Sequence, residues 1–262
     1  MNQTGLWIYC IIENQGKMDW DCLGIHGMSP VFAVGDGEFA AVVSEEPMKK
    51  YPLVRDYLMA HQKVNEQVMQ TRPSLPVRFC TMAEDKEKII REALQPKAAE
   101  FRASLSEIAG RDEYGLRVWW KDLDRLFQKI GETDEKILKK KEFILSLPEE
   151  KRRNELIDVG HLVQKAVQEK NEATAQALLD ELTPLAEQAK QNKILGDAMI
   201  LNAAFLVRQS RQKAFDQQVD LLSTKYGEAL QFRYLGPVPP FNFVEIVIQW
   251  KTEPQMRVAG GI

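Results

Sequence analysis

The run Gly5-Leu6-Trp7-Ile8-Tyr9-Cys10-Ile11-Ile12 decides the fold of the first half of the sequence. It is short and dense in bulky, β-branched and aromatic side chains, which is typical of a strand. Two further apolar runs, at residues 31–34 and 39–44, flank Gly35-Asp36-Gly37. Because glycine tolerates positive φ, this spacer predicts a hairpin. A phosphate-binding loop is disfavoured, since the Gly-Lys-[Ser/Thr] ending of such loops is missing.

Helical and extended segments alternate after this hairpin. Pro47 and Pro52 open a helix whose apolar positions fall on one side as far as Val68. The same criteria predict a turn-rich loop at 14–28, strands at 75–81 and 114–120, and helices at 86–94 and 97–108. Helices on one face of a mixed sheet make an α+β layer, and a ferredoxin-like variant is the nearest common pattern. We therefore predict an N-terminal ferredoxin-like α+β domain over residues 1–112.

From residue 121 the sequence becomes strongly charged, which predicts a helical arm over about residues 121–192. Pro148 ends a first helix at 121–147, and helices at 154–170 and 172–192 are expected to form a hairpin. The segments that follow are a strand at 197–208, a helix at 213–226, a strand at 231–235 and a short apolar helix or strand at 241–250. Together they predict a C-terminal α+β domain over residues 113–250, with the arm as an insertion and a loose tail at 251–262.

The composition is that of a globular protein. The 262 residues (30.0 kDa) are 44% hydrophobic and 28% charged, with a mean hydropathy of −0.34. No apolar stretch approaches the about 20 residues that a membrane helix needs, and the N-terminal residues lack the features of a secretory signal. The net charge of −3 disfavours general nucleic-acid binding, because no overall positive field exists. We expect a cytoplasmic protein with no membrane and no nucleic acid as partner.

No catalytic or metal-binding constellation stands out. The cysteines are Cys10, Cys22 and Cys80, and the histidines are His26, His61 and His161. Each cysteine is interpreted as a small buried side chain in a reducing compartment, and each histidine as structural or solvated. A nucleophilic pair of Cys80 and His61 is a minor alternative, since such pairs meet in space rather than in sequence. We expect no enzyme activity, no cofactor and no metal ion.

Two surfaces are considered for partner binding. Pro239, Pro240 and Phe241 form a stiff, extended segment that cannot lie inside a sheet, and Pro237 and Phe243 flank it. A preordered backbone loses little entropy on binding, so these five residues are the partner-binding candidates, with a rigid corner as the alternative. The second surface, the basic cluster within 136–153, carries seven positive and three negative residues, net +4, and is interpreted as a solvated face.

Five segments together carry a family likeness. In sequence order they are Ala41-Val42-Val43-Ser44-Glu45, Leu75-Pro76-Val77-Arg78-Phe79-Cys80-Thr81, Glu113-Tyr114-Gly115-Leu116-Arg117-Val118-Trp119-Trp120, Asn202-Ala203-Ala204-Phe205-Leu206-Val207 and Gly236-Pro237-Val238-Pro239-Pro240-Phe241-Asn242-Phe243-Val244. In this order and spacing they resemble the GvpL/GvpF family of gas vesicle proteins, and the compact chain is more similar to the GvpF side. The likeness runs from about Trp7 to Val244. Each segment alone is weak, whereas the ordered set is specific.

Four positions depart from the family pattern. Members commonly have glycine where Cys80 stands, an aromatic residue where Val238 stands, and Tyr-Ser where Phe241-Asn242 stands. These changes conserve shape and leave the fold assignment intact, but they alter the docking chemistry of the proline-rich turn.

The resemblance implies a minor, non-enzymatic component or assembly factor of gas vesicles, the hollow protein shells that give aquatic microorganisms buoyancy. It implies two α+β domains, no cofactor, and contact with the small GvpA-like shell protein and with other gas vesicle accessory proteins. It also implies a place on the inner, gas-facing surface of the shell. The proline-rich corner and the predicted helical hairpin are alternative docking surfaces.

Two other classes of function stay open. Two facing α+β units would form a cleft, which is a usual ligand site. In a small-molecule-binding enzyme or regulator of this kind, Arg78, Lys63 and Glu113 are the candidate lining residues. A general chaperone-like scaffold outside gas vesicles is the third class.

Overall fold

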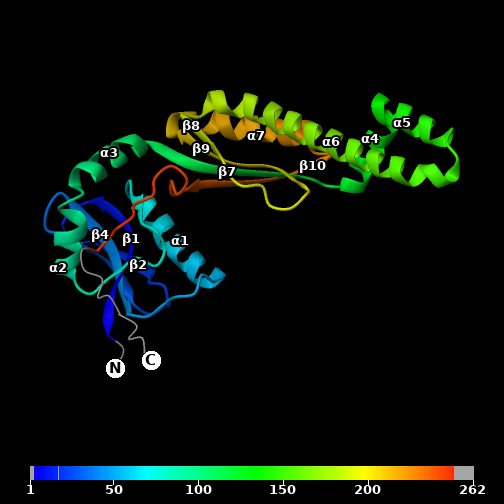
Figure 1. Ribbon diagram of the computed structural model, residues 1–262. Coiled ribbons are helices and arrows are strands. Elements are labelled where there is room, and N and C mark those ends of the chain that lie inside the picture. Colours follow the sequence, from blue (N-terminus) through cyan, green and yellow to red (C-terminus); the bar gives the residue numbers. More distant parts are fainter. Residues whose placement is uncertain (1–2, 17, 251–262) are drawn as a thin grey trace, which may run out of the picture. The chain divides into compact units, whose positions relative to one another are not determined.

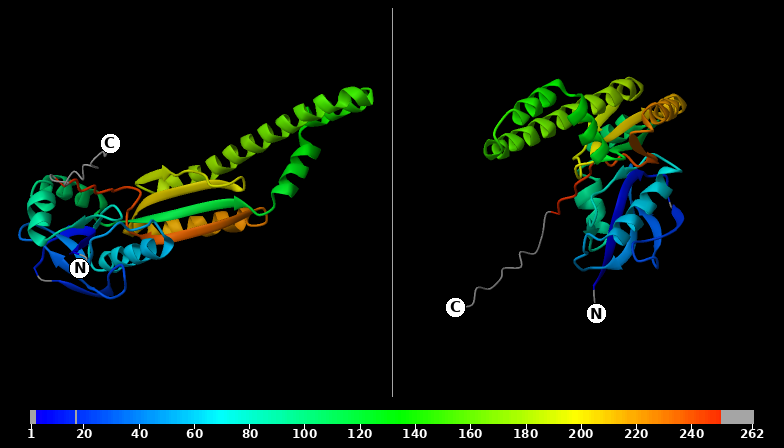
Figure 2. Two further views of the ribbon diagram at one scale, coloured as in Figure 1. Left: turned by 60° about the horizontal axis from the view of Figure 1, so that its bottom comes forward. Right: turned by 90° about the vertical axis from the view of Figure 1, so that its right-hand side faces the viewer.

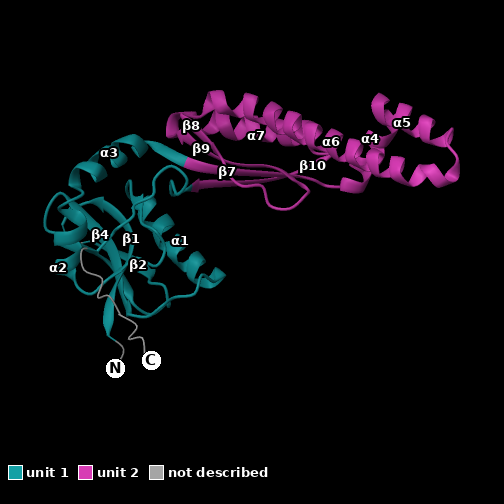
Figure 3. Ribbon diagram, viewed as in Figure 1, with its two compact units in different colours: residues 1–112, 238–262 teal, residues 113–237 magenta. Residues whose placement is uncertain are grey.

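The structure, a computed structural model, describes residues 3–16 and 18–250 and divides them into two compact units (Figure 3). Unit 1 comprises the residues up to Asp112 and those from Val238 on, and unit 2 comprises Glu113–Pro237. Each unit has a sheet with helices packed against it, which confirms the predicted α+β class (Figure 1). The predicted tail at residues 251–262 lies outside the described residues.

Unit 1 is built on a six-stranded sheet with the strand order β2-β3-β4-β1-β5, in which β6 also pairs with β1. The strands are β1 Thr4–Glu13, β2 Asp19–Leu23, β3 Pro30–Val34, β4 Phe39–Pro47, β5 Leu75–Pro76 and β6 Met82–Ala83. β1 lies inside the sheet, between β4 and the short β5 and β6, and runs antiparallel to β4 along its whole length. The hairpin predicted around Gly35-Asp36-Gly37 is confirmed, because these residues join β3 to β4 and Val34 pairs with Ala41.

Helices cover both faces of this sheet, not one as predicted. They are α1 Arg55–Met69, α2 Lys86–Lys88, the π-helical η1 Ile89–Leu94, and α3 Ala98–Ile108. Alternate residues of β1 contribute to two separate cores: Ile11 packs in the core that contains η1 and α3, and Ile12 in the core that contains α1. All residues of β1 except its two ends are buried. A strand covered on both faces reads as a continuous apolar run, which explains the opening stretch of the sequence.

The ferredoxin-like prediction is wrong for unit 1, because four strands precede its first helix. The difference comes from β2, which lies in the predicted loop at 14–28. β2 is a polar edge strand that pairs with β3, and its side chains alternate between exposed and partly buried. The predicted strand at 75–81 is also shorter: β5 and β6 both pair with β1, and residues 77–81 connect them.

Unit 2 has the β-α-β-β-α-β order of the ferredoxin-like motif. Its sheet has the strand order β10-β7-β9-β8. The elements are β7 Arg111–Trp120, α4 Leu123–Thr133, α5 Glu135–Leu145, α6 Glu149–Leu182, η2 Thr183–Leu185, β8 Gln188–Gln191, β9 Met199–Arg208, η3 Gln209–Arg211, α7 Gln212–Tyr226 and β10 Leu230–Val238. Side chains of α6 and α7 pack on one face of the sheet, around Leu116, Phe205 and Phe215.

The arm is organised differently from the prediction. One 34-residue helix, α6, replaces the expected hairpin, and the short α4 and α5 lie along its first half (Figure 2). No glycine or proline occurs from residue 161 to 183, so nothing breaks the helix before Pro184 in η2. The end of the predicted helix at 172–192 is instead β8. Asp122 and Asp134 cap α4 and α5 by accepting hydrogen bonds from backbone N–H groups.

Residues 238–250 belong to unit 1, whereas the sequence predicts them in the C-terminal domain. The reason is burial: Val244, Ile246 and Ile248 lie in the core that contains Ile11. Ile246 also forms an isolated parallel bridge with Val77. The predicted helix or strand at 241–250 is absent, since residues 239–250 are held by single contacts rather than by a ladder.

Candidate functional site

In unit 1, the segment at residues 75–81 lies beside residues 245–246, which directly follow the proline-rich segment. The Arg78 N–H donates to the Ile246 carbonyl at 3.1 Å, and the Ile246 N–H donates to the Pro76 carbonyl at 3.3 Å. Pro76 in turn belongs to β5, which pairs with Cys10 of the central strand. The proline-rich segment is therefore tied through β5 to the middle of the first sheet.

An ion pair joins the same two segments at the surface. Nε and Nη2 of Arg78 both donate to Oε1 of Glu245, at 2.9 and 2.8 Å. The side chains are 56% and 61% exposed, so water screens the pair, and it contributes about 0–1 kcal/mol. The ion pair orients the two segments relative to each other, while the buried residues beside Glu245 hold them in place.

Residues 78–81 form a tight loop whose side chains point alternately outward and inward. Cys80 has a φ of +66°, in the left-handed region that favours glycine. The Thr81 hydroxyl closes the loop by donating to the Arg78 carbonyl at 2.7 Å. Phe79 turns inward and packs edge-on against Trp7, with ring centroids 5.2 Å apart. Because Cys80 is exposed, the prediction of a buried side chain is wrong there, although it is right for Cys10.

The proline-rich corner is a tight turn. The Pro240 carbonyl accepts hydrogen bonds from the N–H groups of Phe243 and Val244, at 3.0 and 2.9 Å, and the Phe241 N–H donates to the Pro239 carbonyl at 2.7 Å. Pro239 and Pro240 are buried and Phe243 is partly buried, whereas Phe241 is 37% exposed. The corner thus presents the Phe241 ring on a fixed backbone.

The five predicted partner-binding residues fall in both units. Pro237 ends unit 2 within β10 and is exposed, while the other four belong to the corner of unit 1. Pro239 and Pro240 fix the turn, and Phe241 offers its surface. Their role in binding a partner stays a prediction.

His61 of α1 lies behind the loop and holds the central tryptophan. The Trp7 indole N–H donates to Nδ1 of His61 at 3.0 Å, so the neutral ring carries its proton on Nε2. Burial lowers the pKa of His61 to about 4. The predicted structural role agrees with this geometry. A nucleophilic pair with Cys80 gains no support, because Cys80 is exposed and His61 is buried.

A second buried polar chain lies in the same unit. The Tyr9 hydroxyl bonds Ser44 at 2.8 Å, Ser44 donates to one Glu46 oxygen at 3.0 Å, and the other oxygen bonds Nδ1 of His26 at 2.5 Å. Burial raises the pKa of Tyr9 above its usual range. A Cβ on Gly24 would lie 2.3 Å from the Ser44 hydroxyl oxygen, so glycine is required there. This chain fastens the loop around His26 to β4.

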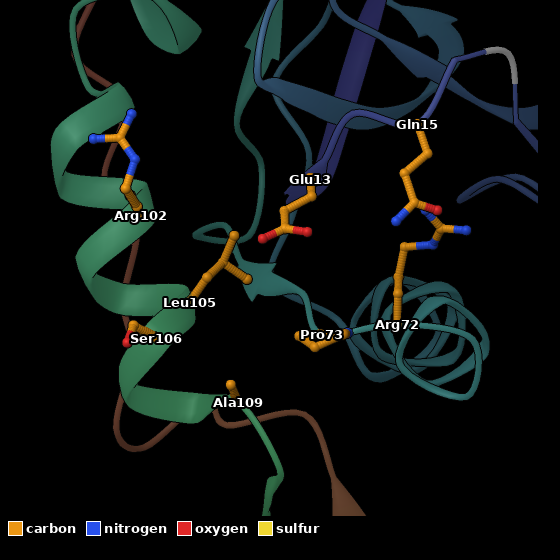
Figure 4. Close-up of a pocket in the computed structure, with 8 residues that line it drawn as sticks. All are labelled: Glu13, Gln15, Arg72, Pro73, Arg102, Leu105, Ser106 and Ala109. Atoms are coloured by element: carbon orange, nitrogen blue, oxygen red, sulfur yellow. The ribbon is translucent and has the colours of Figure 1, made fainter.

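A pocket of about 230 Å³ opens elsewhere in unit 1 (Figure 4). It is lined by Glu13, Gln15, Arg72, Pro73, Arg102, Leu105, Ser106 and Ala109. Its two cations are engaged, since Arg102 pairs with Glu38 and Arg72 donates to Gln15 at 3.3 Å. A second pocket is lined by residues of β1 and β4 and by residues 84–87. Neither pocket includes the predicted lining residues Arg78, Lys63 and Glu113.

The basic cluster on the arm is largely engaged within the arm itself. Lys140 pairs with Glu155, and its Nζ lies 3.5 Å from Asp158. Lys141 donates to the Gly131 carbonyl at 2.7 Å, and Arg152 donates to the Leu147 carbonyl at 2.8 Å. These contacts are compatible with the interpretation of a solvated face, and they add that part of its charge is paired within the arm.

Residues 3–16 and 18–250 provide neither a metal site nor a membrane-spanning helix. In that part of the chain no group of three or more His, Cys, Asp or Glu side chains is arranged to hold a metal ion. Of the helices described there, none has the length and apolar character required to span a bilayer. Sequence reasoning missed the Arg78–Glu245 pair, and its only signal was a lone charge inside the apolar run at 244–248.

Comparison with known proteins gives a family match over most of the chain. The sequence model of the family described as gas vesicle synthesis protein GvpL/GvpF matches residues 5–245. Gas vesicle protein F of Nostoc sp. is 29% identical over 249 residues, covering 93% of this chain and 99% of that protein. Gas vesicle protein F1 of Halobacterium salinarum is 26% identical, covering 93% of this chain and 94% of that protein.

Two solved structures share the fold. The crystal structure of the gas vesicle protein GvpF from Anabaena sp. has a TM-score of 0.81 and 28% identity, covering 93% of this chain and 99% of that one. The crystal structure of GvpF from Microcystis aeruginosa has a TM-score of 0.74 and 25% identity, covering 92% and 99%.

Proposed function

Because the chain belongs to the GvpL/GvpF family of gas vesicle synthesis proteins, we propose that it is a minor component or assembly factor that binds the small shell-forming protein of the vesicle. A role related to gas vesicles is common to the named relatives. Direct contact with the shell protein, a place on the gas-facing surface and the absence of catalysis are the parts that we add.

The observation that carries the proposal is the exposed Phe241 ring on the rigid corner. A docking residue needs apolar surface on a backbone that loses little entropy on binding. Phe241 meets both conditions, since it is 37% exposed and the turn beneath it is closed by the hydrogen bonds to Pro239 and Pro240. The hydrogen bonds of Ile246 with Pro76 and Arg78 tie the residues after the corner to the edge of the first sheet.

The test compares two exposed phenylalanines by calorimetry with a soluble fusion of the shell protein. Phe241→Ala is expected to weaken binding at least tenfold, because aromatic anchors dominate such interfaces. Phe143→Ala removes a ring that is 50% exposed on the arm and serves as the matched control, with an expected change below twofold. Unchanged binding by Phe241→Ala would exclude the corner.

The arm is the alternative docking surface. Leu145, Leu156 and Ile157 are more than half exposed near the turn between α5 and α6. If Phe143→Ala weakens binding and Phe241→Ala does not, the contact lies on the arm. Removal of residues 123–170 is less informative, since it also removes part of α6, whose later residues pack in the core of unit 2.

The location in the vesicle needs a separate experiment. Vesicles are floated, treated with protease either intact or after collapse by pressure, and probed with an antibody to this chain. A gas-facing component floats with the vesicles, and the protease degrades it only when the vesicles have been collapsed. A chain that stays in the soluble fraction is at most a transient assembly factor.

A further inference from the structure

Two strands of the second sheet bring a pair of arginines together. β7 and β10 are neighbours in that sheet (Figure 2). The Lys121 N–H donates to the Ala229 carbonyl at 3.0 Å at one end of the pair. Near the other end, a Cβ on Gly115 would lie 4.0 Å from the Cβ of Leu235. Both contacts give the same antiparallel register.

That register places Arg117 of β7 directly opposite Arg233 of β10. Both side chains point away from the helices. Leu116 and Val118, the neighbours of Arg117, are buried in the core with α6 and α7. Tyr234, the neighbour of Arg233, donates its hydroxyl to Asp216 of α7 at 2.6 Å. Since strand side chains alternate, both arginines lie on the opposite face, and both are exposed.

Like charges directly opposite each other destabilise a sheet, because the Cβ atoms are only about 5 Å apart. Neither Arg117 nor Arg233 has a hydrogen-bond or ion-pair partner among the described residues. An anion between the two guanidinium groups removes this repulsion and accepts charge-assisted hydrogen bonds from both. The chemistry of the pair therefore suits a negative group.

The surroundings of the pair are apolar. Leu235 is 41% exposed two residues from Arg233, and Gly115 opposite it leaves the space of a side chain open. Trp119 lies two residues from Arg117 on the same face and is partly buried. Trp120 packs with the core on the helix side, so the two adjacent tryptophans point to opposite faces of the sheet.

We propose that this face of unit 2 binds an acidic segment of a partner protein, with an Asp or Glu carboxylate between Arg117 and Arg233 and an apolar neighbour against Leu235. The mixture of one charge site and apolar flanks fits a peptide. Nucleic acid fits less well, because it needs a continuous positive surface and the chain has a net charge of −3. The inference stands independently of the corner in unit 1.

The experiment uses the full chain and a fluorescein-labelled ten-residue peptide of alternating glutamate and leucine, followed by anisotropy. Wild type is expected to bind saturably below about 1 mM peptide. Arg117→Gln with Arg233→Gln raises Kd at least tenfold, and each single change raises it three- to tenfold. The control, Lys151→Gln with Arg153→Gln, removes the same charge from exposed positions on the arm and changes Kd less than twofold.

The proposal is overturned if wild type shows no saturable binding of the peptide. It is also overturned if the double arginine variant binds the peptide as tightly as wild type, or if the arm control weakens binding as much as the double arginine variant does. Tighter binding of a ten-nucleotide single strand than of the acidic peptide, lost in the arginine variant, would assign the face to nucleic acid instead.

A readout without ligand tests the juxtaposition itself. Arg117→Gln relieves the repulsion from Arg233, so its melting temperature at low salt is expected to exceed that of wild type. Added salt screens the repulsion and narrows the difference. Arg153→Gln shows no such salt-dependent gain. A lower melting temperature for Arg117→Gln would contradict the opposed pair.

Discussion

The two sheets of this molecule differ in how they are covered. In unit 1, helices lie on both faces, and β1 is buried on both sides. In unit 2, α6 and α7 pack on one face. On the other face β7 and β10 expose Arg117, Arg233 and Leu235, while Ala204 and Leu206 of β9 are buried. The first sheet therefore serves as a core that anchors a corner, while the second presents a face of its own.

The difference between the sheets follows from how apolar and polar residues alternate along their strands. Ile11-Ile12 of β1 places adjacent apolar residues in two cores, whereas Leu116-Arg117 of β7 places one residue in a core and the next in water. A period of two indicates one wet face, and its absence indicates none. Adjacent residues of a strand thus indicate how many faces are covered at that strand.

The largest expected changes in stability come from alanine substitutions of such adjacent residues. Ile11→Ala and Ile12→Ala are each expected to lower the free energy of unfolding by about 2–5 kcal/mol, because both are fully buried. Leu116→Ala is expected to cost a similar amount. Arg117→Ala is expected to change stability by at most about 0.5 kcal/mol, since it is exposed. Urea denaturation of each variant gives the values.

The contrast within each pair is the test, since it compares neighbours in one strand. A large loss for Ile11→Ala with a small one for Ile12→Ala would mean that only one face of the first sheet is covered. A large loss for Arg117→Ala would show that the second sheet is covered there as well.

Much of the fold follows from local sequence. The run around Ile11, the Gly35-Asp36-Gly37 hairpin and the helices that became α1, α3 and α7 are readable because period and turn chemistry are local. β2 was missed because an edge strand with polar alternation looks like a loop. The parallel bridge between Val77 and Ile246 was missed because it joins distant segments, and no local pattern encodes such a pairing.

The candidate sites were predictable to different degrees. The proline-rich segment stands out because proline restricts the backbone. The position of this segment near Arg78 could not be predicted, since the contact depends on the return of residues 238–250 to unit 1. The pair of Arg117 and Arg233 was also hidden, because their register depends on which strands become neighbours.

The two units are also expected to differ in how their stability depends on pH. The pKa of His61 in unit 1 is lowered from 6.5 to about 4 by burial, so the unfolded chain takes up this proton at a higher pH than the folded chain. His61 therefore leaves stability intact above about pH 6.5 and lowers it as the pH falls, by about 3 kcal/mol at pH 4. His161, the histidine of unit 2, is exposed. Hydrogen exchange at pH 7 and pH 5 is expected to show unit 1 loosening first.

The matched variant is His61→Gln, which keeps an acceptor for the Trp7 indole but has no proton to take up. Its stability is expected to be lower than wild type at pH 7 and to depend less on pH between 6.5 and 4. If the two pH profiles run parallel, another group causes the acid sensitivity.

The smallest expected effect concerns one residue of positive φ in each unit. Unit 1 holds Cys80 at a φ of +66°, whereas unit 2 uses Gly196 at +78°. Since Cys80 is exposed, Cys80→Gly loses little packing and relieves the left-handed strain, which is partly offset by the greater chain entropy of glycine. We expect a net gain of about 0.5–1 kcal/mol in the free energy of unfolding. Gly196→Ala, where a Cβ would meet no atom within 4 Å, is expected to lose about 1 kcal/mol by the same strain. Thermal melts of both variants measure these changes in stability. A loss of stability for Cys80→Gly would mean that the thiol makes a stabilising contact at the loop. The cysteine at the family's glycine position would then be an adaptation rather than a tolerated cost.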